Sequence, residues 1–158
     1  MANDSVVVKN PYRHVAYEEA DAGEAGITPG ELLERDANGD FLRHNTATGP
    51  WGGLVAGMPI DPEDDKDDDY DNGARVRAII ARRGMVLDLF LANGENASVT
   101  SLLASDGDGA LDVYAGQAVD EGATGTYTVY EGQVIVGEAR EALNNSSGSP
   151  SRIEVFIY

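Results

Sequence analysis

The chain has 158 residues, a length that suits one domain with a single core. It carries 11 Lys and Arg against 28 Asp and Glu, so its formal net charge is −17 at pH 7. This charge opposes binding to nucleic acid or to an anionic membrane, because such binders need clustered cations. The absence of cysteine excludes disulfides and thiolate chemistry, and no apolar run approaches the ~20 residues of a membrane span. We therefore expect neither a nucleic-acid partner nor a membrane partner.

Two explanations of the acidity are open. One is a disordered chain, but a hydrophobic content of 42% and recurrent β-patterned runs favour a folded protein. The other is a folded protein adapted to concentrated salt, where the Debye length of ~3 Å at 1 M screens self-repulsion. Lysine occurs only as Lys9 and Lys66, and this scarcity together with abundant Asp is typical of extreme halophiles. The first residues lack the basic and apolar regions of a signal peptide, which favours a cytoplasmic origin.

Residues 1–24 differ in composition from the rest of the chain. Two short runs, Ser5–Lys9 and Tyr12–Tyr17, could each form a strand, but Pro11 between them breaks any continuous element. The acidic, Ala- and Gly-rich stretch Glu18–Gly26 shows no periodicity. We expect an extended N-terminal arm over residues 1–24, followed by one β domain over residues 25–158.

The front of the β domain reads as a hairpin followed by two loops. A Pro-Gly turn leads into Glu31–Arg35, and Asn38-Gly39 is a residue pair favoured in hairpin turns before the returning strand Phe41–His44. Trp51 lies in a glycine-rich loop, where it could cover one end of the core or stack on a ligand. The stretch Asp61–Gly73 is too densely charged for burial, so we expect an exposed loop.

The rest of the chain alternates apolar and polar residues, which predicts strands with one dry face. Val99–Ala104 is ambiguous between a strand and a helical turn, and Gly137–Leu143 is better read as a continuing strand than as a helix. Thr126–Tyr130 and Gln133–Val136 read as a hairpin. The further strands expected are residues 54–56, 75–80 with Val76, Ala78 and Ile80 inward, 85–91 with Asp88 outward, 110–114, and the closing strand 152–158.

No pattern in the chain indicates catalysis or metal binding. The acidic loop offers oxygen ligands, but it fails the spacing of a calcium-binding EF-hand loop, and Asp106–Gly109 is better explained as a turn. His14 and His44 are the only histidines, and both sit in unremarkable contexts. We expect no enzyme activity, no cofactor and no metal.

A family resemblance rests on the order of several short segments. Each is a turn or hairpin common in β proteins, and together they run from residue 27 to residue 155: Ile27–Glu34, Asp69–Gly73, Leu91–Gly94, Leu103–Leu111, Val134–Ala142 and Arg152–Val155. This order resembles the capsid decoration, or cement, proteins of tailed double-stranded DNA viruses. The resemblance implies an all-β fold, a compact β-barrel or β-tulip-like domain. It also implies a homotrimer that bridges major capsid protein subunits.

The resemblance further implies a location on the outer capsid surface of the virion, after synthesis in the host cytoplasm. With the high-salt composition, the host would be a halophilic archaeon. The alternative is an acidic β-sandwich binding module with a carbohydrate or cell-surface partner, which an exposed planar cluster around Trp51 would favour. The residues that we expect at a capsid or trimer interface are Val6, Val7, Val8, Tyr12, Arg13, His14, Trp51, Phe156 and Tyr158.

Overall fold

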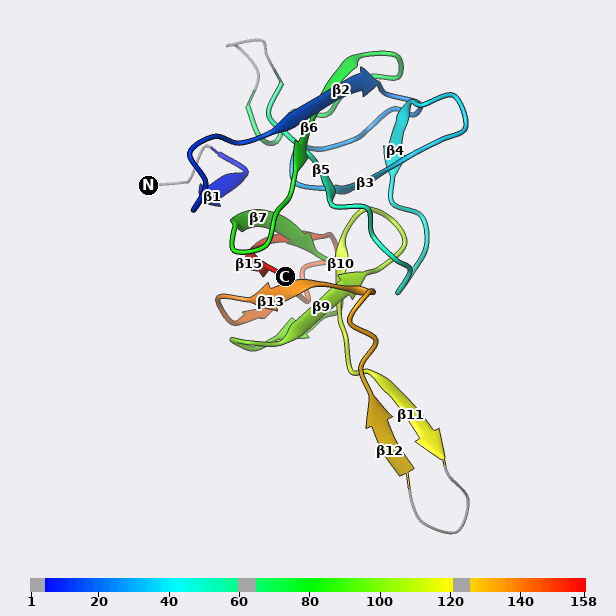
Figure 1. Cartoon of the computed structure of the whole chain (residues 1–158), viewed down its shortest axis with the longest axis vertical. Coiled ribbons are helices and arrows are strands. Elements are labelled where there is room, and N and C mark those ends of the chain that lie inside the picture. The colour runs from blue at the N-terminus through cyan, green and yellow to red at the C-terminus, as the bar shows by residue number, and fades with distance from the viewer. Residues whose placement is uncertain (1–4, 60–64, 121–125) are drawn as a thin grey trace.

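A closed five-stranded β-barrel forms the lower half of the body in Figure 1. The computed structural model describes residues 5–59, 65–120 and 126–158, and every regular element in them is a strand. The strand order around the barrel is β7 (Val86–Leu91), β10 (Leu111–Val113), β9 (Leu102–Ser105), β13 (Ile135–Ala139) and β15 (Ser151–Ile157). Pairing of β15 with β7, from Ser151 opposite Leu91 to Phe156 opposite Val86, closes the ring.

All neighbours in the barrel are antiparallel except β10 and β7, which pair in parallel at Leu111 and Leu91. The short strand β1 (Val7–Lys9) pairs with the first half of β7. It uses the same edge of β7 as β10, which pairs only with the last residue, Leu91. Closure leaves few unpaired backbone groups, which removes the sheet edges that invite unwanted pairing.

A second sheet lies against the barrel in the upper half of Figure 1. Its antiparallel order is β2 (Tyr17–Asp21), β6 (Arg75–Ile80), β5 (Leu54–Ala56), β3 (Leu32–Arg35) and β4 (Phe41–Arg43). A parallel bridge between Ala22 and Phe41 joins the ends of the two outer strands, so the sheet curls on itself. A small pair, β8 (Asn96–Ala97) with β14 (Leu143–Asn144), flanks the barrel, and β11 (Gln117–Asp120) with β12 (Thr126–Val129) forms a projecting hairpin.

One apolar core joins the barrel to the second sheet. The inward residues of β7 and β15 are fully buried, and Leu32, Val55 and Ile79 of the second sheet belong to the same cluster. A separate cluster around Phe41 and Ile27 fills the curl of the second sheet. The predicted alternation of buried and less buried side chains holds along β15, whereas β7 is buried on both faces and successive residues of the second sheet enter different clusters, Leu32 the shared core and Leu33 the cluster around Phe41.

Much of the strand pattern is confirmed. The hairpin of β3 and β4 pairs Leu33 with Arg43, and the strands predicted over residues 54–56, 75–80, 85–91, 110–114 and 152–158 are present within a residue or two. The ambiguous segment before Ser105 is the strand β9, and residues 135–139 continue as β13 without a helix. The all-β fold class and a closed barrel are therefore established.

Three local predictions are wrong. Thr126–Tyr130 pairs with β11 instead of Gln133–Val136, because the turn at Glu131 leads β13 away into the barrel. Tyr12–Tyr17 is no strand, whereas the acidic residues 17–21 form β2, held by pairing to β6. Asp88, expected on a wet face, is buried under Lys66 and Arg152.

The predicted N-terminal arm is not confirmed. Within the described residues, β1 pairs with the barrel and β2 with the second sheet, so this segment is hydrogen-bonded to its own chain at two places. Val6 is buried in the shared core. Most of the acidic loop is exposed where the structure describes it, but Tyr70 is buried in the cluster around Phe41 and Lys66 is half-buried, so the prediction of a fully exposed loop is wrong at these two positions. Residues 61–64 of that prediction lie outside the described residues.

A substitution at Gly137 tests how closely the strands of the barrel pack. A Cβ atom at this position would lie 2.1 Å from the carbonyl oxygen of Phe156 on β15, with no room to move. We expect Gly137→Ala to lower the free energy of unfolding by about 1–3 kcal/mol, because overpacking forces two paired strands apart. The measurement is urea unfolding followed by the fluorescence of Trp51, the only tryptophan.

Gly132→Ala is the matched control, since a Cβ there would meet nothing within 4 Å. Equal stability of the two variants would show that β13 and β15 do not approach so closely.

Candidate functional site

The predicted interface residues of β1 and the Trp51 loop face the chain's own interior. Val6 is buried, and Val7 and Val8 are half-buried beside β7. Trp51 packs against the shared core, and its Nε1 donates a hydrogen bond of 2.9 Å to the carbonyl oxygen of Leu54. These side chains stabilise the joint between the barrel and the second sheet.

The remaining predicted interface residues come together on one exposed face. Tyr12, Arg13 and His14 lie in an exposed loop, and the Tyr12 hydroxyl donates a 2.7 Å hydrogen bond to the carbonyl oxygen of Arg83. The Arg82 guanidinium lies 5.6 Å from the centre of the Tyr12 ring. The loop is therefore fixed against the turn between β6 and β7.

The C-terminus reaches the same turn. The amide of Gly84 donates to the carbonyl oxygen of Ile157 over 2.9 Å. Tyr158, 48% exposed, donates its hydroxyl to Glu138 over 2.7 Å and meets the ring of Phe156 edge-on at 6.1 Å. The hydrogen bond to Glu138 raises the pKa of the Tyr158 phenol, and the nearby charge of Arg83 opposes this rise.

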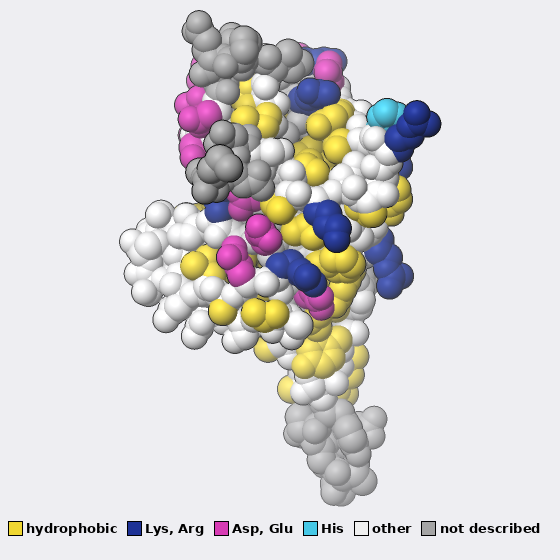
Figure 2. Space-filling view, turned by 90° about the vertical axis from the view of Figure 1, so that its left-hand side faces the viewer, with side chains coloured by type: hydrophobic (Ala, Val, Ile, Leu, Met, Phe, Trp, Pro, Cys, Tyr) yellow, Lys and Arg dark blue, Asp and Glu magenta, His cyan; other side chains and the backbone are white. Residues whose placement is uncertain are grey.

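We call this face the basic patch; its residues are Lys9, Tyr12, Arg13, His14, Arg82, Arg83 and Tyr158. Lys9 joins it because it pairs with Val86, just after the turn. In Figure 2, Asp and Glu side chains gather on the left edge of the upper body, whereas Lys and Arg side chains are spread over the middle and right of the face, with further Asp and Glu side chains among them.

Among the described residues, the four cations of the basic patch have no carboxylate within ion-pair distance, unlike most of the other Lys and Arg side chains. Across the described residues, six of the 11 Lys and Arg have a carboxylate within 4.0 Å: Arg35, Arg43, Lys66, Arg75, Arg140 and Arg152. Arg77 lies 3.7 Å from the centre of the Tyr17 ring instead. The other four cations, with no such partner among the described residues, are all in the basic patch.

A polar groove of about 300 Å³ lies elsewhere, between the start of β3 and the barrel. The backbone amide of Thr28 donates a hydrogen bond of 2.8 Å to the carboxylate of Glu31. Arg43, on the groove wall, forms an ion pair with Glu24. Burial raises the pKa of Glu31 from its ordinary value of 4.5 to about 7, against the lowering effects of the Thr28 amide and Arg43. The lining residues are Thr28, Glu31, Arg43, Phe90, Asp108 and Pro150.

The groove holds one carboxyl group, that of Glu31, that can exchange a proton near neutral pH. Among the described residues that line the groove there is no histidine or cysteine that could react together with it. The buried His44 is already engaged, with Nδ1 2.7 Å from Ser105 and Nε2 3.1 Å from the carbonyl oxygen of Pro50. In the part of the chain that the structure describes, no three His, Cys, Asp or Glu residues are grouped so that they could hold a metal ion.

Arg152 on β15 ties the acidic loop to the body beside this groove. Its Nη2 donates to the carbonyl oxygens of Pro29 and Lys66, and to Asp67 over 2.9 Å. Lys66 in turn pairs with the buried Asp88 over 3.2 Å. The sequence carries no signal for this network, because its members are far apart along the chain.

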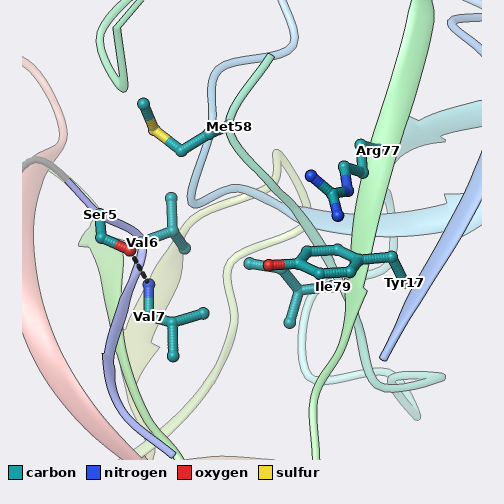
Figure 3. Close-up of a pocket in the computed structure, with 7 residues that line it drawn as sticks. All are labelled: Ser5, Val6, Val7, Tyr17, Met58, Arg77 and Ile79. Atoms are coloured by element: carbon teal, nitrogen blue, oxygen red, sulfur yellow. Dashed lines mark hydrogen bonds between the residues drawn. The ribbon is translucent and has the colours of Figure 1, made fainter. Parts of the chain in front are cut away.

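Figure 3 shows a small cavity between β1 and the second sheet. Its volume of about 40 Å³ suits a water molecule rather than a ligand. The Arg77 guanidinium covers the Tyr17 ring on one side, and Val6 and Val7 form the other (Figure 3). We regard it as a packing gap at the joint between the two sheets.

The projecting hairpin of β11 and β12 is the surface feature that the interface prediction missed (Figure 1). Val119, Val129 and Tyr130 are 41%, 45% and 53% exposed. At its base, Tyr130 meets Tyr114 edge-on at 6.1 Å, and the Tyr114 hydroxyl accepts a hydrogen bond from the amide of Glu131. The alternation of Thr126–Tyr130 was the available signal, but the sequence does not show that both faces are exposed.

Comparison with known proteins adds no relative. Neither a protein-family model nor a curated protein sequence matches this chain. Among the described residues, no helix has the length and apolar character to cross a membrane.

Glu31→Gln tests the burial of the groove carboxyl. The folded-state pKa lies above the unfolded one, so the stability from this group is complete below about pH 4.5 and is lost as pH rises through about 7. Glutamine keeps an acceptor for the Thr28 amide without the buried charge. We expect the variant to be more stable than the parent by up to about 3 kcal/mol at pH 8, and nearly equal at pH 4.

Thermal unfolding across this pH range is the measurement, with Glu131→Gln as the exposed control. A pH-independent difference between Glu31→Gln and the parent would contradict the raised pKa.

Arg152→Met tests the network that holds the acidic loop. The side chains of Arg152 and Asp88 are only 15% and 11% exposed, so removing the guanidinium leaves a buried carboxylate with reduced compensation. We expect the free energy of unfolding, measured in urea, to fall by about 3 kcal/mol. Arg75→Met removes an ion-paired arginine that is 56% exposed, and should cost less than about 1 kcal/mol. Similar losses for both variants would refute the special role of Arg152.

Proposed function

We propose that this protein is a structural virion protein, a capsid decoration protein of a tailed virus with a halophilic archaeal host. In this role it binds the outer surface of an icosahedral head as a homotrimer and stabilises contacts between major capsid protein subunits. The observation that carries the proposal is the projecting β11–β12 hairpin, together with the order of motifs that resembles such proteins.

The hairpin has the properties of a docking element. Its four residue pairs, from Gln117 with Val129 to Asp120 with Thr126, form an isolated two-stranded ribbon, which is marginal in water without a covering surface. Val119 and Val129 fall on the same face, because residues in register share a face and successive residues alternate.

The body that carries the hairpin is suited to a clamp. A closed ring of strands and a core shared between two sheets resist deformation. A trimer would bring three hairpins to one shell, and avidity would then replace strong individual contacts. We assign the docking role to the hairpin rather than to residues 1–24, since β1 and β2 already pair within the chain.

The alternative of a binding module with a carbohydrate or cell-surface partner would be favoured by an exposed planar cluster around Trp51. Trp51 is half-buried and hydrogen-bonded to Leu54 instead. This placement favours the decoration protein over the binding module.

Val119→Asp combined with Val129→Asp tests the docking role. We expect the double variant to fold like the parent, because both side chains are exposed, but to lose most of its occupancy on heads. Two carboxylates on a contact face must be desolvated without partners. The measurement is co-expression with the major capsid protein of the same genome, particle purification and quantification of bound chain.

Val99→Asp is the control, since Val99 is 56% exposed and lies outside the hairpin. Full occupancy by the double variant would remove the hairpin as the docking element. Failure of the parent chain to co-purify with heads would remove the decoration function itself.

A further inference from the structure

We propose that the basic patch binds a carboxylate-rich surface of a partner protein. This surface is distinct from the β11–β12 hairpin, and the inference holds whether or not the partner is a capsid protein. Its residues come from three separate parts of the chain: β1 with the loop after it, the turn between β6 and β7, and the C-terminus.

The first argument is the distribution of charge. With 28 carboxylates against 11 cations, most cations on this chain find a partner, and six of them do. Lys9, Arg13, Arg82 and Arg83 are all exposed and have no carboxylate within ion-pair distance among the described residues. Four unneutralised cations on one face create a local positive potential on an otherwise negative molecule.

The second argument is that the patch is already ordered. The Tyr12 hydroxyl is bonded to the backbone of Arg83, and the Arg82 guanidinium lies over the Tyr12 ring. Tyr158 is held by Glu138 at the edge of the patch. Ordered Arg and Tyr side chains lose little freedom on binding, and these two residue types dominate the energetic centres of protein interfaces.

The third argument identifies the partner's chemistry. Guanidinium groups bind carboxylates through paired, charge-assisted hydrogen bonds. A duplex nucleic acid or an anionic bilayer presents negative charge well beyond the patch, and would also meet the acidic residues of the surrounding surface. A cluster of Asp and Glu on a folded protein is local, so it can contact the patch without that repulsion. An acidic protein surface therefore fits the patch best.

The test uses the intact chain and a fluorescein-labelled polyglutamate peptide as probe, with binding followed by fluorescence anisotropy. We expect binding that weakens as salt rises, because the contacts are electrostatic. The variant Arg82→Ser/Arg83→Ser should bind about tenfold more weakly, because exposed ion pairs each contribute modestly to binding.

The matched control is Arg35→Ser/Arg75→Ser, which also removes two exposed arginines but takes them from existing ion pairs. This control should bind the peptide like the parent, because Arg35 and Arg75 lie outside the basic patch. Since the net charge changes equally in both variants, a difference between them cannot come from net charge alone. Circular dichroism and the melting temperature of each variant establish that the fold is retained.

Three results would overturn the proposal: no binding of the peptide by the parent chain, equal weakening in both double variants, or tighter binding of a DNA duplex or phosphatidylglycerol vesicles than of the peptide. The Val119→Asp/Val129→Asp variant separates the two surfaces, because it should keep peptide binding. If this variant loses head occupancy but keeps peptide binding, the hairpin and the basic patch act as independent surfaces.

Discussion

The guanidinium of Arg152 is the interaction on which the arrangement of this protein depends most. It joins β15 to the acidic loop through Asp67 and Lys66, and to the turn before β3 through Pro29. The same side chain lies 4.4 Å from the Phe90 ring centre and shares Asp88 with Lys66. Without this cation, Asp67 would lose its partner and the buried carboxylate of Asp88 would retain only Lys66.

The scarcity of cations makes their placement informative. Arg152, Lys66 and Arg43 are used where acidic segments approach the body, and the remaining ion pairs sit mostly on the exposed face of the second sheet. Glu31 shows the consequence of a shortage, because its burial beside two further carboxylates raises its pKa to about 7. Cations left unpaired in the basic patch are therefore a distinctive property of that face, rather than the ordinary state of this surface.

The strands of this protein are of two kinds: those that pack against a core and those of the projecting hairpin. In the barrel and the second sheet, each strand is paired along most of its length and supplies side chains to a shared core. No described residue of the β11–β12 hairpin belongs to that core, and Val119 and Val129 expose their side chains. A stiff body that carries a projecting hairpin with exposed valine side chains and one cationic face offers two surfaces on which contacts with other proteins can be tested. This form is the physical basis of the proposed role on a shell.

The sequence by itself determined the fold class and most strands, because alternation in stretches such as residues 85–91 and 151–157 is a local property that reports a buried face directly. It named Tyr12, Arg13, His14 and Tyr158 among the expected interface residues, but it did not indicate that they lie on one face. Only the tertiary structure decided which strands pair, so that β12 joins β11 and the acidic residues 17–21 become β2. The burial of Asp88 and Glu31 was likewise decided there, since burial depends on neighbours that arrive from distant parts of the chain.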